Sequence, residues 1–414
     1  MRRVVRSLNW RRNSSSVTRP DRFWKPVRSL SQRGPLNRNL FFIAAALLLW
    51  GFGEGMFFNF VPIRLENDFH LSKQSVGLAL GAFGFFMAIT HLPGGHLSDR
   101  VGRRPLLITA WLFGVVSTLT MWLADSLPAY LMGLFGYGMT AFVASPLGSY
   151  VTAARGRLPI GAALSLTTAT FNIGMALGPV TGGWIAEHYG MRTSYLAAFG
   201  LFVVSTLFIL AIESQSLDRH DPDAPPISLW RNARFINFVA VFAFAVFATY
   251  LSQPLTPNFL KGARGLTLTE TGWVFSAGAL GNSLLSLGIG RFLHPRRGFI
   301  LAQALVAFFA TLIWRGAGLS TFMLAYFLLG GFRAARPMAM AQARELVHDS
   351  QMGISYGAME TVSAAIFIVA PPIAGFIFER DPYFIYPLAI GLIVVSIFVS
   401  YFFSPRAAKS VIGD

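Results

Sequence analysis

The chain has 414 residues, of which 54% are hydrophobic and only 13% are charged. An average soluble domain carries about 25% charged residues, so this composition excludes an ordinary soluble protein and indicates a chain embedded in lipid. There is no cysteine, which excludes disulfides, thiol nucleophiles and cysteine-based metal sites. The formal net charge is +16, and its distribution along the chain argues against nucleic-acid binding.

Residues 1–39 form a basic tail with eleven basic residues, interspersed serines and one acid, Asp21. We interpret the tail as a cytoplasmic arm lying on anionic lipid headgroups, where each base contributes about 1 kcal/mol. An arginine- and serine-rich, acid-poor start also fits an organelle transit peptide, and a misassigned start codon is a third alternative. No secretory signal is visible in the tail.

A spanning helix needs about 20 mostly apolar residues, and such stretches follow the tail at regular intervals. The twelve predicted spans are 40–63, 75–97, 104–125, 127–150, 161–186, 191–213, 235–258, 270–293, 299–316, 320–343, 354–378 and 383–404. Several contain Gly or Pro, which membrane helices tolerate because their neighbours satisfy the freed backbone groups.

The distribution of Lys and Arg sets the orientation of the spans. With the N-terminus in the cytoplasm, the inner loops and both tails hold 25 of the 34 basic residues. Two more lie within a span, and the outer loops hold Arg64, Lys73, Arg192, Lys261, Arg264, Arg315 and Arg380. This asymmetry follows the positive-inside rule and places both termini in the cytoplasm.

A charged motif of the form G-x-L-x-D-R-x-G-R-R joins the spans 75–97 and 104–125. Its defining residues are Gly95, Asp99, Arg100, Gly102, Arg103 and Arg104. The motif resembles the cytoplasmic loop between the second and third helices of the major facilitator superfamily. Helix count and spacing extend this resemblance over roughly residues 38–405. The resemblance implies a transporter whose two bundles alternately expose a central site.

The same resemblance assigns gating roles to this loop. Gly95 would let its helix approach the span 354–378 closely and so close the cytoplasmic side. Asp99 would lie near the N-terminus of that span, at about 349–353, where a carboxylate is stabilised by about 0.3–1 kcal/mol. The three arginines would supply ion-pair partners or anchor the loop to lipid. Alternatively, they only set the topology.

The span 161–186 carries a second motif, g-x-x-x-G-P-x-x-G-G. It consists of Gly174, Gly178, Pro179, Gly182 and Gly183. Glycines four residues apart line one helix face and permit close packing, and the proline removes one backbone hydrogen bond. The motif matches the signature of antiporters in the superfamily, so the resemblance points to the twelve-helix drug/proton antiporter group. A general small-residue interface is the alternative.

The sequence departs from the family pattern at one position that matters for proton coupling. Many proton-driven members carry an arginine in the fourth helix, four residues before a glycine, where this chain has Met132. A proton-relay role for that arginine therefore cannot be transferred to this chain.

The hydrophilic stretch from Ser214 to Arg234 divides six spans from six. Shifting the chain by 192 residues aligns 178–187 with 370–379, with four of ten positions identical and Glu187 on Glu379. We therefore predict an all-α membrane protein with two pseudo-symmetric six-helix bundles. The predicted parts are a basic tail (1–39), an N-terminal bundle (40–213), a cytoplasmic linker (214–234) and a C-terminal bundle with a short cytoplasmic tail (235–414).

Charges inside spans are costly, so each one is a candidate site. Four stand out: Glu54, Arg333, Arg336 and Glu360. At about 1.5 Å per residue, Arg336 and Glu360 share a depth and are expected to pair, whereas Glu54 and Arg333 lie nearer the midplane. Glu54 is either a proton carrier or a structural partner of Arg333.

Polar and aromatic side chains on the expected cavity helices complete the predicted site. They are Asn59, Tyr137, Thr140, Ser145, Ser149, Thr249, Tyr250 and Gln253. We predict a secondary active transporter that works by alternating access, with proton-coupled efflux of drug-like or metabolite molecules as the leading mode. One alternative is proton-coupled uptake of a small solute, which includes an anionic one. Two others are lipid transport and a membrane receptor or scaffold that transports nothing.

Enzymatic activity is not expected, because the chain has no HExxH motif, no Walker A loop and no cluster of metal-binding side chains. We expect no cofactor and no metal. The expected partners are a small-molecule substrate, protons and membrane lipid, but not nucleic acid. We expect a monomer in the bacterial inner membrane.

Overall fold

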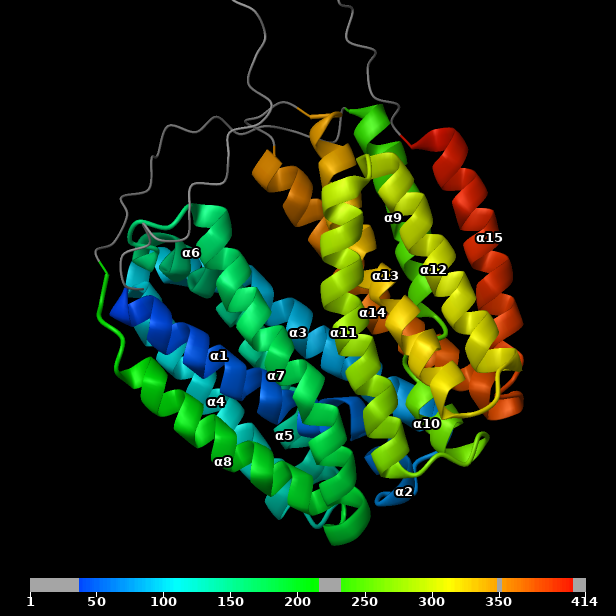
Figure 1. Ribbon diagram of the computed structural model, residues 1–414, viewed down its shortest axis with the longest axis horizontal. Coiled ribbons are helices and arrows are strands. Elements are labelled where there is room, and N and C mark those ends of the chain that lie inside the picture. Colours follow the sequence, from blue (N-terminus) through cyan, green and yellow to red (C-terminus); the bar gives the residue numbers. More distant parts are fainter. Residues whose placement is uncertain (1–36, 216–231, 348–351, 405–414) are drawn as a thin grey trace, which may run out of the picture. The chain divides into compact units, whose positions relative to one another are not determined.

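The computed structural model describes residues 37–215, 232–347 and 352–404, without the side chains of 91–100, 145 and 352–354. Helices form all the regular secondary structure in these ranges (Figure 1). They are α1 (Arg38–Phe57), η2 (Phe58–Phe60), α2 (Val61–Asn67), α3 (Lys73–Val101), α4 (Arg103–Leu123), α5 (Leu127–Met139), η3 (Thr140–Val143), α6 (Ala144–Ala154), α7 (Ile160–Tyr189), α8 (Met191–Leu210), α9 (Ala233–Tyr250), α10 (Thr256–Gly262), α11 (Leu268–Phe292), α12 (Pro295–Arg315), α13 (Leu319–Arg344), α14 (Met352–Arg380) and α15 (Ile385–Phe403).

The described helices are compatible with the predicted count of twelve spans. Ten segments of the described chain are long and apolar enough to cross a membrane, and the bent pair α5–α6 makes an eleventh. The twelfth is α13, which has 26 residues and carries Arg333 and Arg336. The two charges make α13 less apolar than its neighbours, although its length suffices for a span.

Two of the predicted spans are shorter or more bent than the sequence suggested. The stretch predicted as 235–258 is helical only to Tyr250, and a turn containing Pro254 separates it from α10. The span 127–150 bends by 42° around η3, just before Pro146. Both breaks lie close to a proline, which has no backbone N–H and cannot continue a regular hydrogen-bond ladder.

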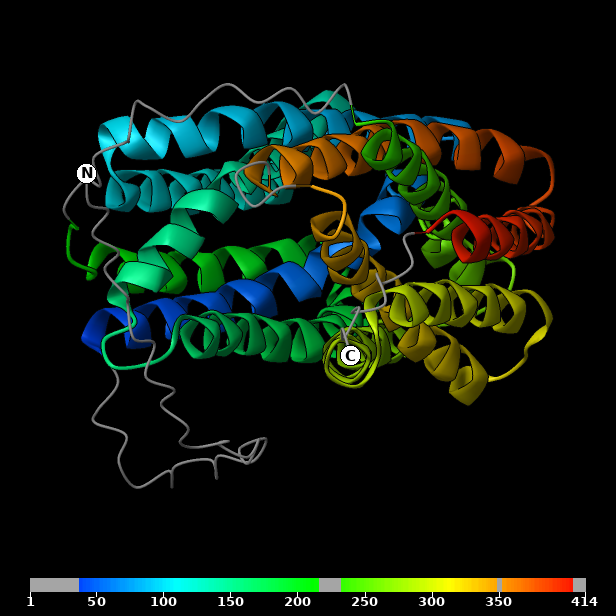
Figure 2. The ribbon, with the colours of Figure 1, turned by 90° about the horizontal axis from the view of Figure 1, so that it is seen from above.

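The helices alternate in direction between two ends. We call the end where α1 begins and α15 ends the basal end, and the end that holds α2 and α10 the distal end (Figure 1). Within the first half α1 packs on α7 and α8, and within the second half α13 packs on α11 and α12. Two further pairs join the halves, α3 with α14 and α7 with α11, and α3 and α14 run side by side in Figure 2.

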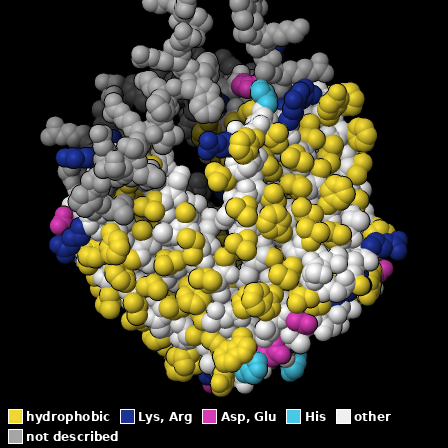
Figure 3. Space-filling view, viewed as in Figure 1, with side chains coloured by type: hydrophobic (Ala, Val, Ile, Leu, Met, Phe, Trp, Pro, Cys, Tyr) yellow, Lys and Arg dark blue, Asp and Glu magenta, His cyan; other side chains and the backbone are white. Residues whose placement is uncertain are grey.

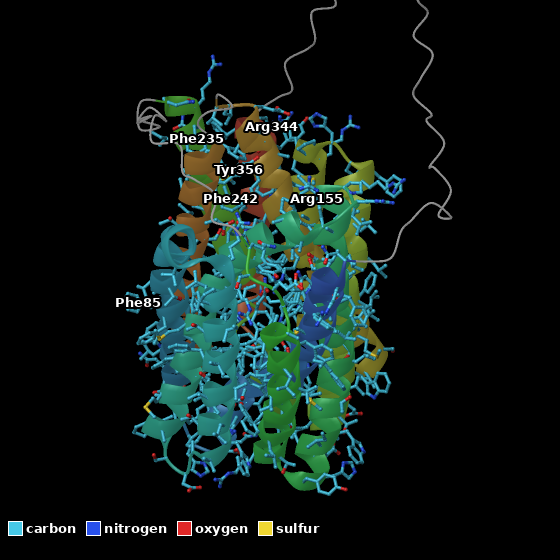
Figure 4. The ribbon with its side chains drawn as sticks, turned by 90° about the vertical axis from the view of Figure 1, so that its left-hand side faces the viewer. Phe85, Arg155, Phe235, Phe242, Arg344 and Tyr356 are labelled. Atoms are coloured by element: carbon cyan, nitrogen blue, oxygen red, sulfur yellow. The ribbon has the colours of Figure 1, made fainter. Side chains whose placement is uncertain are left out.

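Large apolar side chains cover the outside of the helices at helical spacing. Leu112 and Val116 on α4 are exposed, as are Phe398 and Phe402 on α15. Phe85 projects outward from α3 in the same way (Figure 4). Hydrophobic side chains cover most of the face in Figure 3, with charged side chains mainly near its two ends. An apolar outer surface of this extent is stable in lipid but not in water.

The two ends of the interface between the halves are packed differently. At the distal end a methyl group added to Gly77 would collide with the Pro371 carbonyl of the other half, and one added to Gly272 would collide with that of Pro179. At the basal end, Gly148, Gly161 and Gly357 have no atom within 4 Å of such a methyl group. The halves are therefore in backbone contact distally, whereas methyl groups at these three basal glycines would touch nothing and the ribbons of the two halves diverge toward the basal end in Figure 1.

Candidate functional site

A cavity of about 460 Å³ lies between the halves, and aromatic side chains form much of its wall. Helices α1, α3, α4, α5 and α7 of the first half contribute most of the lining. The charged residues among the lining are Glu54 of the first half and Arg333 of the second. This arrangement is that of a substrate pocket, a mostly apolar cavity with few polar groups.

Glu54 is held by two neutral donors. Trp50, one helical turn earlier on α1, donates its Nε1–H to Glu54 Oε2 at 3.2 Å, and Tyr137 of α5 donates its hydroxyl to the same oxygen at 2.8 Å. Trp50 stacks in turn on Phe202 of α8, with ring centroids 4.2 Å apart. The stacked rings fix the orientation of both donors, so the carboxylate has a defined place on the cavity wall.

Arg333 faces the same cavity from α13, and its side chain is exposed. Among the ion pairs of the described residues, none joins Arg333 to Glu54. The alternative in which the two lock the halves together as an ion pair is thus absent from this conformation. Each charge is available to a substrate or a proton from the cavity side.

The expected ion pair between Arg336 and Glu360 is present and joins α13 to α14. Its side chains are 52% and 39% exposed, so the pair is not the buried lock that a midspan position suggested. The reason is the separation of the halves at the basal end, which leaves this depth open. Exposed pairs of this kind contribute about 0–1 kcal/mol.

Three predicted cavity residues lie away from the lining. Asn59 falls in η2, beyond the point where α1 ends. Tyr250 ends α9 and stacks on Phe332 with ring centroids 5.7 Å apart, while Gln253 donates its amide to the Thr249 carbonyl in the turn that follows. In the turn that follows residue 250 a backbone carbonyl thus satisfies the Gln253 amide, and Asn59, Tyr250 and Gln253 are absent from the lining of this cavity.

Tyr137 and Thr140 line the cavity as expected. Ser149 lines a second, more basal hollow of about 670 Å³ together with Arg103 and Arg155. Figure 4 shows Arg155 at this end of the first half, and Arg344 at the same end of the second. Ser145 has its side chain outside the described part, and Thr249 is buried, with its hydroxyl donated to the Ala245 carbonyl. The prediction of the cavity lining therefore fails mainly for the second half, whose Thr249, Tyr250 and Gln253 do not line the cavity.

The charged loop motif is described only in part. The side chains of Gly95, Asp99 and Arg100 lie outside the described residues, as does the expected contact region at 349–353. Gly102 has a φ of +94°, a left-handed conformation that favours glycine and lets α4 follow α3 after a sharp turn. The gating role of Asp99 remains a prediction.

The two remaining arginines of the loop attach it to the end of α8. Arg103 donates to the side-chain oxygen of Gln215 at 3.1 Å, and Arg104 donates to the Leu210 carbonyl at 2.9 Å. The contact of Arg104 satisfies a carbonyl at the C-terminus of α8, where a cation is also favoured. Both partners lie in the first half, so these contacts hold the bundle together without bridging the halves.

The glycine–proline motif of the predicted span 161–186 forms two packing surfaces on α7. A methyl group at Gly178 would collide with the backbone of Phe52 and Gly55 on α1, and one at Gly182 would collide with Met56. Gly174 packs on α1 in the same way. Gly183, on another face of α7, meets the Leu268 carbonyl of α11 in the second half. The motif thus brings α7 into backbone contact with both the helix that carries Glu54 and the opposite half.

Sequence reasoning missed a buried cation at the distal end. Arg64 was assigned to an outer loop, but it lies within α2 and is 2% exposed. Its guanidinium lies 4.7 Å from the ring centroid of Tyr130 and 4.3 Å from that of Tyr195, and it pairs with Asp68 at 3.4 Å. The two tyrosines are more than 60 positions further along the chain, so no local pattern could have revealed this cation–π site.

Within the described residues, no cluster of His, Cys, Asp or Glu could hold a metal ion. The side chains that line the cavity include one carboxylate, one guanidinium, one phenol, two indoles and three threonine hydroxyls among apolar groups. These groups bind ions and aromatic or amphiphilic molecules, and the carboxylate can also bind a proton.

Comparisons with known proteins agree with this description. The profile of the Major Facilitator Superfamily matches residues 43–253 and 235–413. The chain is 23% identical to Multidrug resistance protein 2 of Bacillus subtilis (strain 168) over 351 residues, which cover 79% of this chain and 86% of the relative. It is 26% identical to the class C tetracycline resistance protein of Escherichia coli over 377 residues, covering 83% and 91% respectively.

Solved structures of transporters share the fold. A variant of the nucleoside transporter NupG superposes with a TM-score of 0.78 at 12% identity, covering 88% of this chain and 99% of that one. The human organic anion transporter MFSD10 superposes with a TM-score of 0.65 at 16% identity, covering 89% and 100%. At such low identity the likeness shows the shared fold alone.

Proposed function

This chain belongs to the major facilitator superfamily, and we propose that within it the protein is a proton-coupled exporter of small drug-like or metabolite molecules. The names of its relatives from Bacillus subtilis and Escherichia coli, a multidrug and a tetracycline resistance protein, support export as the mode. The transported molecule enters the cavity between the halves and leaves after the halves rock about it.

The observation that carries the proposal is the placement of Glu54. A carboxylate away from bulk water is costly unless it is paired, hydrogen-bonded or protonated. Glu54 has two neutral donors and no ion pair in the described structure, and it faces the cavity. In the proposed cycle, a proton and a cationic or polar substrate group occupy this carboxylate in turn, which couples the two fluxes.

The packing of α7 supports the same reading. Because Gly174, Gly178 and Gly182 bring α7 into backbone contact with α1, a rocking motion of the first half must move Glu54 together with α7. Because Gly183 of α7 contacts α11, this motion also changes the packing between the halves at the distal end. Proton binding near Glu54 and opening of the distal seam are thereby mechanically linked.

We further propose that the basal end faces the cytoplasm of a bacterium, with both termini on that side and the protein acting as a monomer. The proposal rests on the excess of Lys and Arg in the inner loops and tails. The cavity would then be open to the cytoplasm, from which an exporter takes its substrate.

A flux experiment tests the proposed function. The purified chain in liposomes should accumulate tetracycline or a fluorescent cationic dye against its gradient when protons are supplied on the destination side. Collapse of the pH gradient with a proton carrier should stop accumulation at once. Accumulation that persists without a pH gradient, or that occurs on the alkaline side, would contradict proton-coupled export.

Arg333 favours a second candidate, proton-coupled uptake of an anionic solute. The guanidinium is exposed to the cavity, and the described residues supply it with neither a hydrogen bond nor an ion pair. The same liposomes separate the two functions, because an anionic solute should then move in the direction of the proton gradient. Arg333→Gln should abolish that uptake while leaving export of a cationic dye intact.

A further inference from the structure

Two carboxylates at the distal end reach across the interface to the helices of the other half. Glu379, near the end of α14, accepts a hydrogen bond at 3.2 Å from the backbone N–H of Gln74, in the first turn of α3. Glu187, near the end of α7, accepts one at 2.8 Å from the backbone N–H of Thr269, in the first turn of α11. Each acid thus caps a helix of the opposite half.

The two caps have the same geometry. Each capped helix begins with a hydroxyl residue whose side-chain oxygen accepts from the third N–H of that helix: Ser72 for α3 and Thr267 for α11. In each case the acid of the opposite half accepts from the second N–H. The first turn of both helices therefore has donors that its own half leaves open and the other half satisfies.

The backbone contacts between the halves next to each cap show the same symmetry. Gly77 of α3, three residues after the capped Gln74, meets the carbonyl of Pro371 on α14, and Gly272 of α11 meets the carbonyl of Pro179 on α7. The shift of 192 residues that aligns the halves takes Pro179 to Pro371 and Glu187 to Glu379. The caps are hence related by the pseudo-symmetry that exchanges the two bundles.

We infer that Glu187 and Glu379 are paired positioning residues that hold the distal end closed and must release both helix N-termini before the outward-open state can form. A carboxylate at a helix N-terminus is favoured by the exposed N–H groups and by the helix dipole. Separation of the halves at the distal end breaks both hydrogen bonds together, so the two caps add to the stability of the closed state.

A third cross-half contact lies beside the caps. Asn258 of α10 donates to Glu66 of α2 at 2.6 Å, and Glu66 also pairs with Lys73 at the start of α3. Burial lowers the pKa of Lys261 on α10. The nearby carboxylates of Asp68 and Glu187, both in the first half, oppose this lowering. The caps thus sit within a polar layer that joins the halves at this end.

The inference rests on alternating access but not on efflux, so its test reads conformation without any substrate. Because the chain has no native cysteine, spin labels can be attached to introduced cysteines without further changes. One pair, Asn67→Cys with Ala263→Cys, reports the distance between α2 and α10 at the distal end. A second pair, Arg157→Cys with Glu345→Cys, reports the basal end.

In the full-length protein in liposomes, Glu187→Ala or Glu379→Ala should raise the ratio of distal-open to distal-closed molecules roughly fivefold, and the double variant roughly thirtyfold. The basal distance should shorten in the same molecules. Glu270→Ala is the matched control, because Glu270 accepts from Thr267 of its own helix and bridges nothing. It should leave both distances unchanged.

Unchanged distances in the double variant, or an equal shift in Glu270→Ala, would overturn the inference. If the alanine variants fail to fold, Gln variants keep the shape and remove only the charge, and should shift the ratio in the same direction. As an independent check, a short thiol crosslink between Gln74→Cys and Glu379→Cys should stop dye flux until it is cleaved. Wild-type flux through the crosslinked protein would also overturn the inference. Absence of flux in every variant together with normal distance changes would instead count against efflux alone.

Discussion

The distal and basal ends of the interface are built from the same helices but in opposite ways. Distally, glycines bring α3 against α14 and α7 against α11 so closely that a single added methyl group would meet backbone. Basally, Gly148, Gly161 and Gly357 have open space around them, and the Arg336–Glu360 ion pair within the second half is partly exposed. The distal end joins the halves through backbone contacts, whereas the basal end leaves these glycines and this charged pair uncovered.

The difference explains why one chain can hold two states. An interface in which backbones touch is rigid, because closely packed surfaces deform little before they separate, so it is either closed or open. An exposed ion pair such as Arg336–Glu360 at the other end contributes only about 0–1 kcal/mol.

Replacing Gly178 and Gly182 with Leu should abolish transport and lower the amount of folded protein, because each side chain would have to enter the backbone of α1. Folded protein can be measured by size-exclusion chromatography of a fluorescent fusion, and transport by dye flux. Gly200→Leu on α8 is the matched control, since a methyl group there meets nothing within 4 Å. Normal transport by the double Leu variant would mean that the seam between α1 and α7 is looser than described.

Asp99→Asn should lose transport by at least about tenfold while expression and membrane insertion stay near normal. The expected cause is loss of a carboxylate at a helix N-terminus when the basal end closes, which is worth about 0.3–1 kcal/mol or more. Dye flux corrected for protein amount measures the effect. Asp125→Asn, which breaks only an exposed pair with Arg192, is the control. Equal flux in the two variants would remove Asp99 from the gate.

Glu54→Gln should retain exchange of substrate across the membrane and lose accumulation driven by a pH gradient. An amide keeps the hydrogen bonds from Trp50 and Tyr137 but cannot release a proton. Both modes can be measured on one liposome preparation. Equal loss of both modes would indicate a structural role for Glu54, and full pH-driven accumulation would leave Glu360 as the next acid to test.

The smallest effect is expected for the pair Arg336 and Glu360. A double-mutant cycle with Arg336→Leu and Glu360→Leu, measured by denaturation in detergent, should give a coupling energy of about 0.2–1 kcal/mol. A buried pair would instead lose about 3–5 kcal/mol on removal of one partner. A coupling energy in that higher range would show that the basal region is closed around the pair in the membrane.

Several features of the molecule follow from local sequence. Runs of apolar residues bounded by charged turns predict helices that are long enough for the bilayer, and the twelve-span count followed from them. Glycines four residues apart on 161–186 predicted a close crossing, which the contacts with α1 and α11 confirm. Depth counted along each helix predicted the pairing of Arg336 with Glu360.

Other features depend on which helices meet. The pattern around Glu54 could not tell whether its partner would be Arg333 or the side chains of Trp50 and Tyr137, because α5 lies far away in the chain. The aromatic cage around Arg64 has the same origin. The break after Tyr250 was missed because apolar composition alone does not show where a proline-containing turn will form.

The class of this protein, its spans and the helix faces that must pack closely can be inferred from local sequence, since these depend on hydrophobic length and on the absence of a side chain at glycine. The three-dimensional arrangement was needed to learn which end of the interface is closed, how exposed each charge is, and that Glu187 and Glu379 cap helices of the opposite half. Those properties are set by distances between segments more than 80 residues apart, which hydropathy and spacing along the chain do not encode.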